Sequence, residues 1–571
     1  MIIRTLILAT GAAAMAFASP VGAQSDSLQY FSRSHSDALP RLLTTDDRAY
    51  YASLFEAIDG ENWDRVEVAL AQREDGPLHG TALATYFLHP KSPRIELPRI
   101  EDWLRKYPEN PNVEGLIRLG QTRGLSWAPS LPREQSLQRQ PGITRRNLPR
   151  TVEDGTMPDS VRTAILDRIS NDDPDGARLL LDGVDASLSP AARAEWRRRV
   201  AWSYYIENRD AEAYAMAQLV SQGSGPWVAE GDWVAGISAW RLGDCARAGD
   251  YFNAAASGAD NAELRVASHY WAARSLIRCR KPDLANGHLR SAARYDETLY
   301  GMLAAEQLGM ELPDNHSAPD LTADDWRRLS GKAAVQQAVM LAEIGRRDLA
   351  DDILRWQVRY GDPEEFGALT RLARALGLAG AQTFMAYNAP RGQKSPASLR
   401  WPVAYHVPSG GWQVDPALAF AHALQESNFR ERVVSPANAI GLMQIRPIAA
   451  REYAASINMS AGADLKDPRT NLAFGQRALE ALANSNVTQG SLPKVMAAYN
   501  AGPSPVARWN GEINDQGDPL LWMESIPYWE TRSYVAIVMR NYWMYLRQAQ
   551  AEAPSRRELA ENDWPRFPRT R

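Results

Sequence analysis

Hydrophobic residues between positions 42 and 389 recur with the period of an α-helix. This region is rich in Ala, Leu, Arg, Glu and Trp and has few runs of β-branched residues, which favours helices almost throughout. Short polar turns interrupt the pattern, and after each of them a new helix opens on an alanine, at Ala177, Ala213, Ala248, Ala285 and Ala350. The gaps between these alanines are 36, 35, 37 and 65 residues, the last close to twice the others. A period of about 35 residues is typical of one helical hairpin in a solenoid, so we expect stacked hairpins in a curved array.

Aromatic residues are frequent in the predicted hairpins, for example in the segment GDWVAGISAWRLGDCARAGDYFNAAAS. Trp233, Trp240, Tyr251 and Phe252 have two interpretations: they fill the gaps between helices, or they form a surface on which sugar rings stack. Aromatic stripes of this kind usually belong to the core, so we favour packing between helices.

Two proline-rich breaks divide the chain. The first, residues 129–158, is interpreted as a long connection within the helical region, and the second, residues 388–402, ends that region. We therefore predict a repeat domain over residues 24–397, with a helical linker near 320–397, and a second domain over 398–550. Residues 551–571 carry three prolines and are expected to form a polar tail that is poorly ordered or lies on the surface.

The amino-terminal stretch MIIRTLILATGAAAMAFASPVGAQS has the features of a secretory signal peptide. Arg4 precedes an apolar run from Leu6 to Ala18, and Val21-Gly22-Ala23 provides a small-x-small cleavage site, which predicts a signal peptide over residues 1–23. A membrane anchor is the alternative, but the apolar run is shorter than the roughly 20 residues that a spanning helix needs. We expect no membrane segment after cleavage.

Composition narrows the classes of function. A chain of 571 residues exceeds the size at which single cores stop growing, about 250–300 residues, so two or more domains are expected. A formal charge of -4 lacks the basic excess of a nucleic-acid binder. With only two cysteines, Cys245 and Cys279, we expect no metal site and no cofactor. These cysteines form a disulfide or remain buried thiols, and the sequence leaves both alternatives open.

The candidate chemistry lies in the second domain. Asp415-Pro416 is a good helix start, and Glu426 falls near the end of the helix that follows. The carbonyl end of the helix dipole and partial burial both disfavour a negative charge, so its pKa should rise and the group could donate a proton near neutral pH. A solvated surface glutamate is the alternative. The neighbouring motifs instead suggest a site for a ligand rich in hydroxyl and amide groups, such as a sugar chain, built from Ser427, Ser435, Gly441, Met443, Gln444, Tyr499, Asn500 and Glu530.

Five motifs carry a resemblance to a known family. In order and spacing, QES at 425–427, SPANAIGLMQIRP from Ser435, DPRTNLAFG from Asp467, AYNAGP from Ala498 and IPYWETRSYV from Ile526 resemble those of the soluble lytic transglycosylases, family 1 of the lysozyme-like lytic enzymes. The motifs cover Trp401 to Tyr545. The resemblance implies an all-α protein, with an α-superhelical ring or horseshoe followed by a lysozyme-like, α-rich catalytic domain.

The resemblance also implies roles for single residues. Glu426 matches the catalytic acid/base of the family, with Ser427 next to it. Ser435 and Tyr499 match the positions that hold the N-acetyl group of the reacting muramic acid, while Gln444 and Glu530 match positions along the glycan cleft. Arg446 departs from the pattern, because the family commonly has Met there; a side chain that points into the cleft would favour carboxylates of the peptide stems, whereas one that points out would change little.

The activity that the resemblance implies is cleavage of the MurNAc-β-1,4-GlcNAc bond of peptidoglycan without water, in a periplasmic location. Two alternatives stay open. A hydrolytic muramidase would need a second carboxylate, for which Glu431, Glu452, Asp464 and Glu530 are the nearby candidates. A non-enzymatic scaffold would use the repeats as a docking surface. The repeats of an active enzyme could also hold the glycan strand or dock a peptidoglycan synthase or another cell-wall protein.

Overall fold

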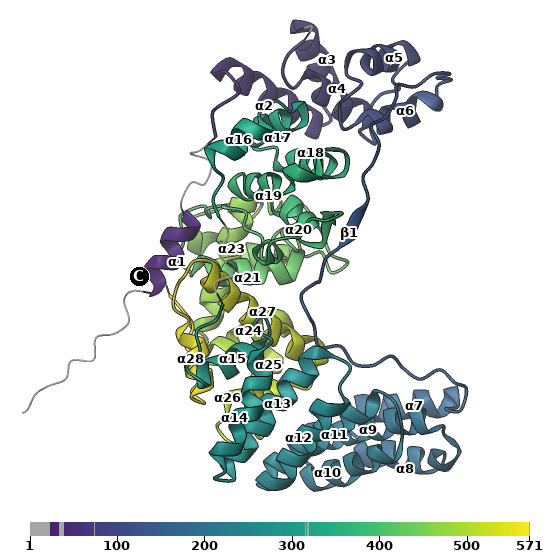
Figure 1. The fold of residues 1–571 in the computed structure, drawn as a ribbon, viewed down its shortest axis with the longest axis vertical. Helices are drawn as coiled ribbons and strands as arrows, with labels where there is room; N and C mark the ends of the chain where they lie inside the picture. The colour runs from purple at the N-terminus through teal and green to yellow at the C-terminus, as the bar shows by residue number, and fades with distance from the viewer. Residues whose placement is uncertain (1–22, 33–38, 74, 314–315, 317–318, 570–571) are drawn as a thin grey trace, which may run out of the picture.

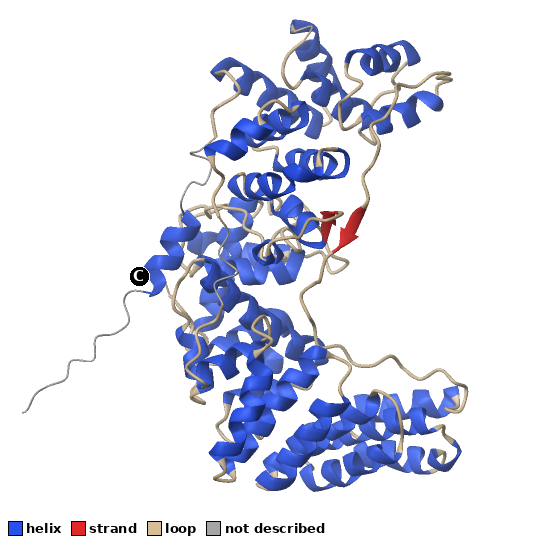
Figure 2. Cartoon of the chain, viewed as in Figure 1, coloured by secondary structure: helices blue, strands red, loops and turns tan. Residues whose placement is uncertain are grey.

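The computed structural model describes residues 23–32, 39–73, 75–313, 316 and 319–569. The predicted signal peptide, except for its last residue, lies outside the described residues. Helices account for nearly all regular structure in the described part of the chain (Figure 2), which confirms the all-α prediction. Within these ranges, no helix combines the length and apolar character needed to cross a lipid bilayer.

The helices form three groups along a curved molecule (Figure 1). One end is built from α2 (Thr45–Asp59), α3 (Trp63–Gln72), α4 (His79–Leu88), α5 (Leu97–Lys106), α6 (Val113–Gln121), α16 (Ala323–Leu329), α17 (Ala333–Glu343), α18 (Arg347–Tyr360), α19 (Phe366–Ala375) and α20 (Ala379–Tyr387). The other end is built from α7 (Asp159–Ser170), α8 (Pro174–Asp182), α9 (Pro190–Ile206), α10 (Asp210–Gln218), α11 (Trp227–Arg241), α12 (Cys245–Gly258), α13 (Ala262–Arg278), α14 (Pro282–Ala293) and α15 (Leu299–Gln307).

The third group lies between these ends. It contains α21 (Pro416–Ser427), α22 (Pro447–Tyr453), α23 (Pro468–Ala483), α24 (Leu492–Ala501), α25 (Pro503–Glu512), α26 (Pro519–Ser525), α27 (Trp529–Gln548) and α28 (Pro554–Ala560). The first helix, α1 (Ala23–Ser32), packs against this group, where Phe31 meets the rings of Phe420 and Tyr545.

The alanines that mark the repeat are all buried in the second helix of a hairpin. Ala177, Ala213, Ala248, Ala285 and Ala350 lie in α8, α10, α12, α14 and α18. An alanine at this position lets two helices approach closely, because its side chain fills little space. The long gap before the last alanine contains α15 and α16, which do not form a hairpin: α15 packs on α14 and the C-terminal helices, and α16 on α19.

The aromatic residues of α11 and α12 are packed between helices, as favoured from the sequence. Trp233 is buried with its ring 5.3 Å from that of Phe252, and Trp240 is buried with its ring 5.3 Å from that of Trp271. Tyr251 is partly buried, and its hydroxyl accepts a hydrogen bond from Gln218. These rings are therefore part of the core and do not form a platform for sugars.

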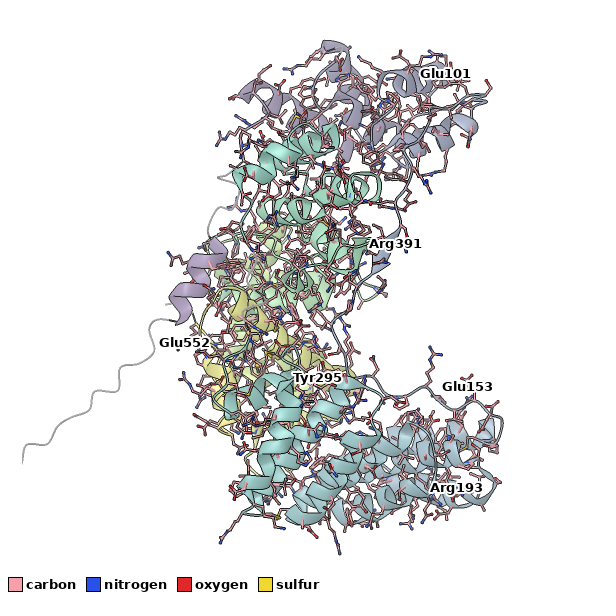
Figure 3. The ribbon with its side chains drawn as sticks, in the orientation of Figure 1. Glu101, Glu153, Arg193, Tyr295, Arg391 and Glu552 are labelled. Atoms are coloured by element: carbon pink, nitrogen blue, oxygen red, sulfur yellow. A yellow bond between two sulfur atoms is a disulfide. The ribbon has the colours of Figure 1, made fainter. Side chains whose placement is uncertain are left out.

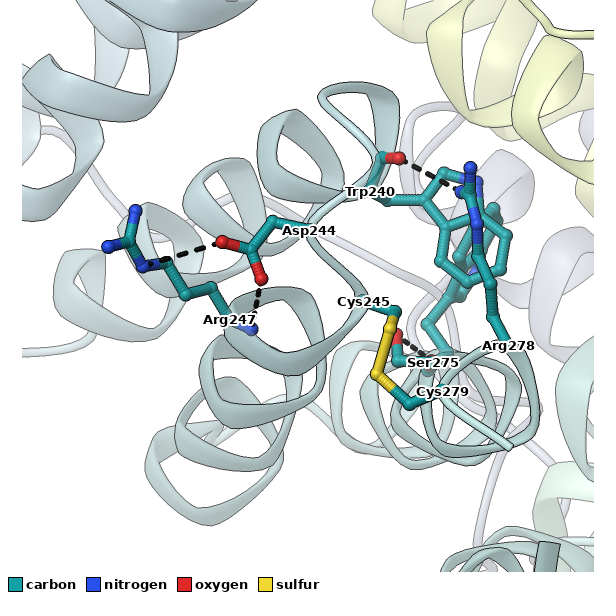
Figure 4. Close-up of a disulfide and its surroundings, with 8 residues drawn as sticks. Trp240, Asp244, Cys245, Arg247, Ser275, Arg278 and Cys279 are labelled. Carbon is teal, nitrogen blue, oxygen red and sulfur yellow. Dashed lines mark hydrogen bonds and ion pairs between the residues drawn. A yellow bond between two sulfur atoms is a disulfide. The ribbon is translucent and has the colours of Figure 1, made fainter. Parts of the chain in front are cut away.

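Cys245 and Cys279 form a disulfide between neighbouring hairpins (Figure 4), which decides between the two alternatives left open by the sequence. Cys245 is the first residue of α12 and Cys279 directly follows α13, so their Cα atoms lie 5.6 Å apart. Asp244 caps α12 by accepting from the Arg247 N–H, which fixes the start of the helix beside the bridge.

The described residues build two large hydrophobic cores and a small third cluster of Ala194, Val220 and Trp227, and the predicted repeat domain 24–397 is divided between the two large cores. One core joins α2–α6 to α16–α20, and the other joins α7–α15 to α21–α28. No residue from 126 to 156 is fully buried, and the stretch only packs against the outside of the cores, through Trp127 and Leu137 on one and Ile143 and Val152 on the other. The C-terminal group and the second set of hairpins therefore share one continuous core.

The two proline-rich breaks pair with each other in a small antiparallel sheet. Strand β1 (Leu137–Arg139) from the first break pairs with β2 (Asn388–Pro390) from the second, with Gln138 opposite Ala389. The N–H of Arg391, labelled beside this crossing in Figure 3, donates to the Ser136 carbonyl. Backbone pairing thus ties the long connection to the end of the helical region.

Of the two alternatives for the C-terminal segment, a poorly ordered tail or one that lies on the surface, the structure contradicts the first. Residues 554–560 form α28, which packs on α15, and Leu559 and Phe567 are buried. Trp543 of α27 donates to the Ser555 hydroxyl at 2.9 Å. The sequence suggested a tail because polar residues and prolines predominate there, but buried apolar side chains, an ion pair between Arg556 and Glu306 and backbone pairing at Arg566 hold it on the neighbouring elements.

Candidate active site

Glu426 lies in the last turn of α21. Asp415 caps the start of this helix by accepting from the Ala417 N–H at 2.9 Å, and Pro416 occupies the first turn, where no backbone donor is needed. The helix ends at Asn428, which adopts a left-handed conformation with φ 52°. Nearly every other residue of α21 is buried, whereas Glu426 is partly exposed. The helix therefore presents one carboxyl group at the edge of the core.

Burial raises the pKa of Glu426 from its ordinary value of 4.5 to about 7. That value includes two smaller influences: a hydrogen bond from the Tyr534 hydroxyl to Oε1, 2.7 Å long, lowers the pKa, and the nearby negative charge of Glu530 raises it. The sequence predicted the direction of the shift, although it emphasised the helix dipole and only partial burial. Near neutral pH a large fraction of the group keeps its proton.

His422 is a site residue that the sequence did not single out, and Tyr534 lies in the motif IPYWETRSYV without a separate predicted role. Tyr534 lies on α27, and its hydroxyl also lies 2.8 Å from Nδ1 of the buried His422. His422 is four residues before Glu426 on α21, and Tyr534 is four residues after Glu530 on α27. This helical spacing places each pair on one face and was the available signal.

The segment 433–446 forms a tight loop beside α21. The Ser435 hydroxyl accepts from the Ala439 N–H at 3.1 Å, and short β-bridges join Ile440 to Val434 and Ile445. Gln444 has a positive φ of 50°, and its side-chain amide donates to the Gly441 carbonyl at 2.9 Å. The loop thus fixes its own polar side chains before any ligand arrives.

Gly441 and Asn471 hold this loop against α23. Gly441 has φ 76°, and a Cβ there would lie 2.5 Å from the Leu465 carbonyl oxygen, so only glycine fits. The Asn471 amide donates to the carbonyls of Ile440 and Leu465 and accepts from the Met443 N–H, each at 2.8 Å. The motif DPRTNLAFG therefore supports the loop, a role that the sequence did not assign to Asn471.

Two predicted substrate contacts are wrong for the side chains concerned. Ser427 is 1% exposed, and its hydroxyl donates to the Leu442 and Ala423 carbonyls. Met443 is fully buried. Neither side chain is free to meet a ligand, because both connect the loop to the interior. Both residues were predicted as substrate contacts because they lie inside motifs that match the family, and such motifs contain residues that serve folding as well as binding.

Tyr499, Asn500 and Glu530 come from two further helices. The Tyr499 ring lies 4.7 Å from the His422 ring, and its hydroxyl donates to the Met443 carbonyl at 2.8 Å. Asn500 accepts from the Thr531 hydroxyl at 2.7 Å, which joins α24 to α27. Glu530 is exposed in the first turn of α27, where the helix dipole favours a negative charge.

The four acids considered as a second carboxylate differ in their surroundings. Glu431 is bound to Nε2 of His406 at 2.7 Å, the Asp464 carboxylate accepts from the Lys466 N–H, and Glu452 is exposed on α22. Among these four described residues, only Glu530 perturbs the pKa of Glu426. In the described ranges, no group of three or more His, Cys, Asp or Glu residues could hold a metal ion.

Arg446 directly precedes α22, and its side chain is exposed. Its backbone is extended, with φ -79° and ψ 139°, as expected for a residue before proline. This position leaves the guanidinium in solvent beside the loop that carries Gln444.

A buried ion cluster attaches α27 to the repeats. Arg146, from the long connection, lies 3.3 Å from the Glu230 carboxylate of α11 and 3.4 Å from that of Glu524 at the end of α26. Tyr300 of α15 donates to Glu524 at 2.7 Å, and Arg532 of α27 donates to the Glu524 carbonyl at 3.1 Å. The helix that carries Tyr534 and Glu530 is therefore held from the side of the hairpins.

Comparison with known proteins agrees with this geometry. Residues 407–520 match the family model of the transglycosylase SLT domain. The chain is 33% identical over 178 residues to the soluble lytic murein transglycosylase of Escherichia coli K12, a match that covers 29% of this chain and 26% of the relative. The chain thus spans about a quarter of the length of that curated relative.

Two solved structures share the fold over most of the chain. The 70 kDa soluble lytic transglycosylase SLT70 of Escherichia coli superposes with a TM-score of 0.53 at 18% identity, covering 92% of this chain and 100% of that one. An inactive mutant of the lytic transglycosylase Slt of Pseudomonas aeruginosa gives a TM-score of 0.52 at 19% identity, covering 94% and 84%. The chain therefore contains a segment that matches the transglycosylase SLT domain, within a fold similar to that of the soluble lytic transglycosylases.

Proposed function

We propose that this protein is a lytic transglycosylase that cleaves the MurNAc-β-1,4-GlcNAc bond of peptidoglycan and leaves 1,6-anhydro-MurNAc ends. The observation that carries the proposal is a single carboxyl group, Glu426, with a pKa raised to about 7 in the segment that matches the SLT domain. The relative in Escherichia coli is a murein transglycosylase by name, which supports peptidoglycan as the substrate class.

In the first step, Glu426 acts as general acid. Its proton passes to the glycosidic oxygen, the bond from the MurNAc C1 to that oxygen breaks, and GlcNAc leaves with a new hydroxyl group. The electron-poor C1 is stabilised by the acetamido oxygen of the same sugar, so that no second carboxylate is required. Tyr534 donates to Oε1 of Glu426 and stabilises the carboxylate that the transfer produces.

In the second step, Glu426 acts as general base. The carboxylate takes the proton of the MurNAc C6 hydroxyl, whose oxygen bonds to C1 and displaces the acetamido oxygen. This closes the 1,6-anhydro ring and restores the protonated acid. A group with a pKa near 7 serves both steps, because it exchanges its proton readily in each direction.

Residues around Glu426 suit a glycan ligand. We assign Ser435 and Tyr499 to the N-acetyl group of the reacting sugar, and Gln444, Asn500 and Glu530 to neighbouring positions along the strand. The amides and hydroxyls offer directional hydrogen bonds, and the tyrosine ring offers an apolar face. Gly441 contributes through the loop conformation that it permits.

A hydrolytic muramidase is the second candidate function, and the observation that favours it is the influence of Glu530 on Glu426. This acid influences the pKa of Glu426, as a second carboxylate across a glycosidase site would. A retaining or inverting mechanism requires the two carboxyl groups about 5–9.5 Å apart. Glu530 is exposed at the start of α27, a position that suits contact with the substrate.

We place the protein in the periplasm. The Cys245–Cys279 disulfide suits an oxidising compartment, and the signal peptide predicted at the amino terminus leads to the same location. The hairpins would hold the glycan strand or dock a partner such as a peptidoglycan synthase, while the C-terminal helices cut.

The test is incubation with purified sacculi followed by mass analysis of the released muropeptides. Wild type should release anhydro products, Glu426→Gln should release none, and Glu512→Gln, at an exposed pair with Arg508, should match wild type. Products one water heavier would establish hydrolysis, and cleavage by Glu426→Gln would exclude the assigned acid/base. Absence of cleavage by folded wild type would favour the scaffold function.

A further inference from the structure

His422 is a buried histidine one helical turn before Glu426. Its side chain has no solvent exposure, and Nδ1 lies 2.8 Å from the hydroxyl oxygen of Tyr534, which lies 2.7 Å from Oε1 of Glu426. The ring packs beside those of Tyr499 and Tyr534, at centroid distances of 4.7 and 5.8 Å. Three polar groups from two helices thus form one chain that ends at the candidate acid.

The number of available hydrogens determines which group donates in each hydrogen bond between His422, Tyr534 and Glu426. An ionised carboxylate only accepts hydrogen bonds, and a tyrosine hydroxyl has a single hydrogen. When Glu426 is ionised, Tyr534 must donate to it, and Nδ1 of His422 must therefore donate to Tyr534. The Nε2 atom of His422 is buried without a partner, which is less unfavourable for a bare lone pair than for an N–H. Burial lowers the pKa of His422 to about 3, so the ring stays neutral.

The same direction restricts the protonated acid. A proton on Oε1 of Glu426 would point at Tyr534, whose hydroxyl would then have to donate to Nδ1 of His422. That arrangement requires the other tautomer, with an N–H at Nε2 buried where no acceptor exists. Among the described residues, Oε2 of Glu426 accepts no hydrogen bond, and the side chain is partly exposed.

We propose that His422 is a positioning residue whose Nδ1–H orients the Tyr534 hydroxyl and thereby confines the transferable proton of Glu426 to Oε2, the oxygen open to substrate. The proposal rests on the proposed function, in which Glu426 is the acid. His422 touches no substrate and acts through Tyr534. The titratable groups that face it are Tyr499 of α24, Tyr534 of α27 and Glu426 of its own helix, and Glu530 is the next charge along α27.

The tautomer of His422 can be measured without any activity. Nitrogen-15 chemical shifts of labelled protein distinguish Nδ1–H from Nε2–H, and the signal is assigned by its loss in His422→Asn. We expect the neutral Nδ1–H form between pH 5 and pH 8. A neutral Nε2–H form, or a ring that gains a proton in this range, would overturn the proposal even if the enzyme were active.

Two variants separate orientation from packing. His422→Asn places an amide N–H near the position of Nδ1 and should keep the pH profile of anhydromuropeptide release. His422→Leu removes the donor, and we expect kcat to fall about tenfold with KM unchanged, the scale of one lost hydrogen bond. The alkaline limb of the pH profile of His422→Leu should move to higher pH, because a less polarised Tyr534 hydroxyl stabilises the Glu426 carboxylate less.

A double variant completes the test. In a Tyr534→Phe background the series of hydrogen bonds from His422 to Glu426 is already interrupted, so adding His422→Leu should change neither kcat nor the alkaline limb of the pH profile. Equal losses from His422→Leu in both backgrounds, with an unmoved limb, would show a packing role and refute the proposal. If Glu426→Gln cleaved sacculi as well as wild type, the proposed function would fail, whereas the measured tautomer would still report the direction of the chain.

Discussion

Replacing Glu426 by glutamine should stabilise the protein at alkaline pH while it removes the candidate acid. The carboxyl group has a pKa near 7 in the folded chain and an ordinary value of 4.5 when unfolded. Since the folded state binds this proton more tightly, ionisation opposes folding. The sign is therefore opposite to that of a salt-bridged carboxylate: below pH 4.5 the group has no effect, and stability falls as pH rises from 4.5 to about 7.

The magnitude follows from the difference in proton affinity. Each tenfold change is worth about 1.4 kcal/mol, so the ionised group costs the fold about 3 kcal/mol above pH 8. Glutamine has nearly the same shape and no charge. Any effect of lost hydrogen-bond strength is the same at every pH, so the pH-dependent part belongs to ionisation alone.

The assay compares urea unfolding of wild type and Glu426→Gln at pH 5 and pH 8.5. The advantage of the variant should grow by about 2 to 3 kcal/mol between these values, and groups elsewhere cancel because both proteins share them. Glu512→Gln, at an exposed pair, should show no such growth. An advantage that is equal at both pH values would refute the inference that Glu426 is a protonated group at neutral pH.

Three further predictions concern the frame of the site. Gly441→Ala should abolish cleavage and lower the melting temperature, because the new Cβ would collide with backbone. Gly462 is open to solvent, so Gly462→Ala should leave glycan release unchanged. Equal behaviour of the two variants would contradict the role assigned to Gly441 in the loop. Cys245→Ser should lose about 2–4 kcal/mol of stability in unfolding experiments, and a reductant should then lower the stability of wild type but not of the variant. Glu524→Gln should cost about 3–5 kcal/mol, because Arg146 loses one of its two carboxylate partners in a buried cluster, and it should slow cleavage because the attachment of α27 is weakened; a variant as stable as wild type would refute the anchoring role.

The helices and the candidate acid could be predicted because their signals are local. Buried alanines at a 35-residue period mark hairpins, and Glu426 follows a capped, apolar helix. The hydrogen bond between Glu426 and Tyr534 could not be predicted, because 108 residues separate them and only the folded chain brings α27 next to α21. Burial of Ser427 could not be inferred either, because the carbonyl that its hydroxyl meets belongs to a loop 15 residues away.

The division into cores was also beyond a pattern of helices. Hairpin periodicity tells which segments are helical but not which hairpins touch, and residues 43–125 pack with 321–399 rather than with their neighbours along the chain. The packing of the C-terminal segment could not be predicted for a related reason. Leu559 is one apolar side chain in a polar context, and its value depends on α15, some 250 residues earlier.

The continuous core between α7–α15 and α21–α28 means that the C-terminal group, which carries the candidate site, is not a detachable module. A chain truncated to begin at residue 398 would expose the buried surface that Tyr300 and Tyr205 now cover beside Glu524 and Ser525, and it would aggregate or need a replacement surface. Exchange of such segments between related proteins would therefore have to carry the adjoining hairpins along as one inherited unit.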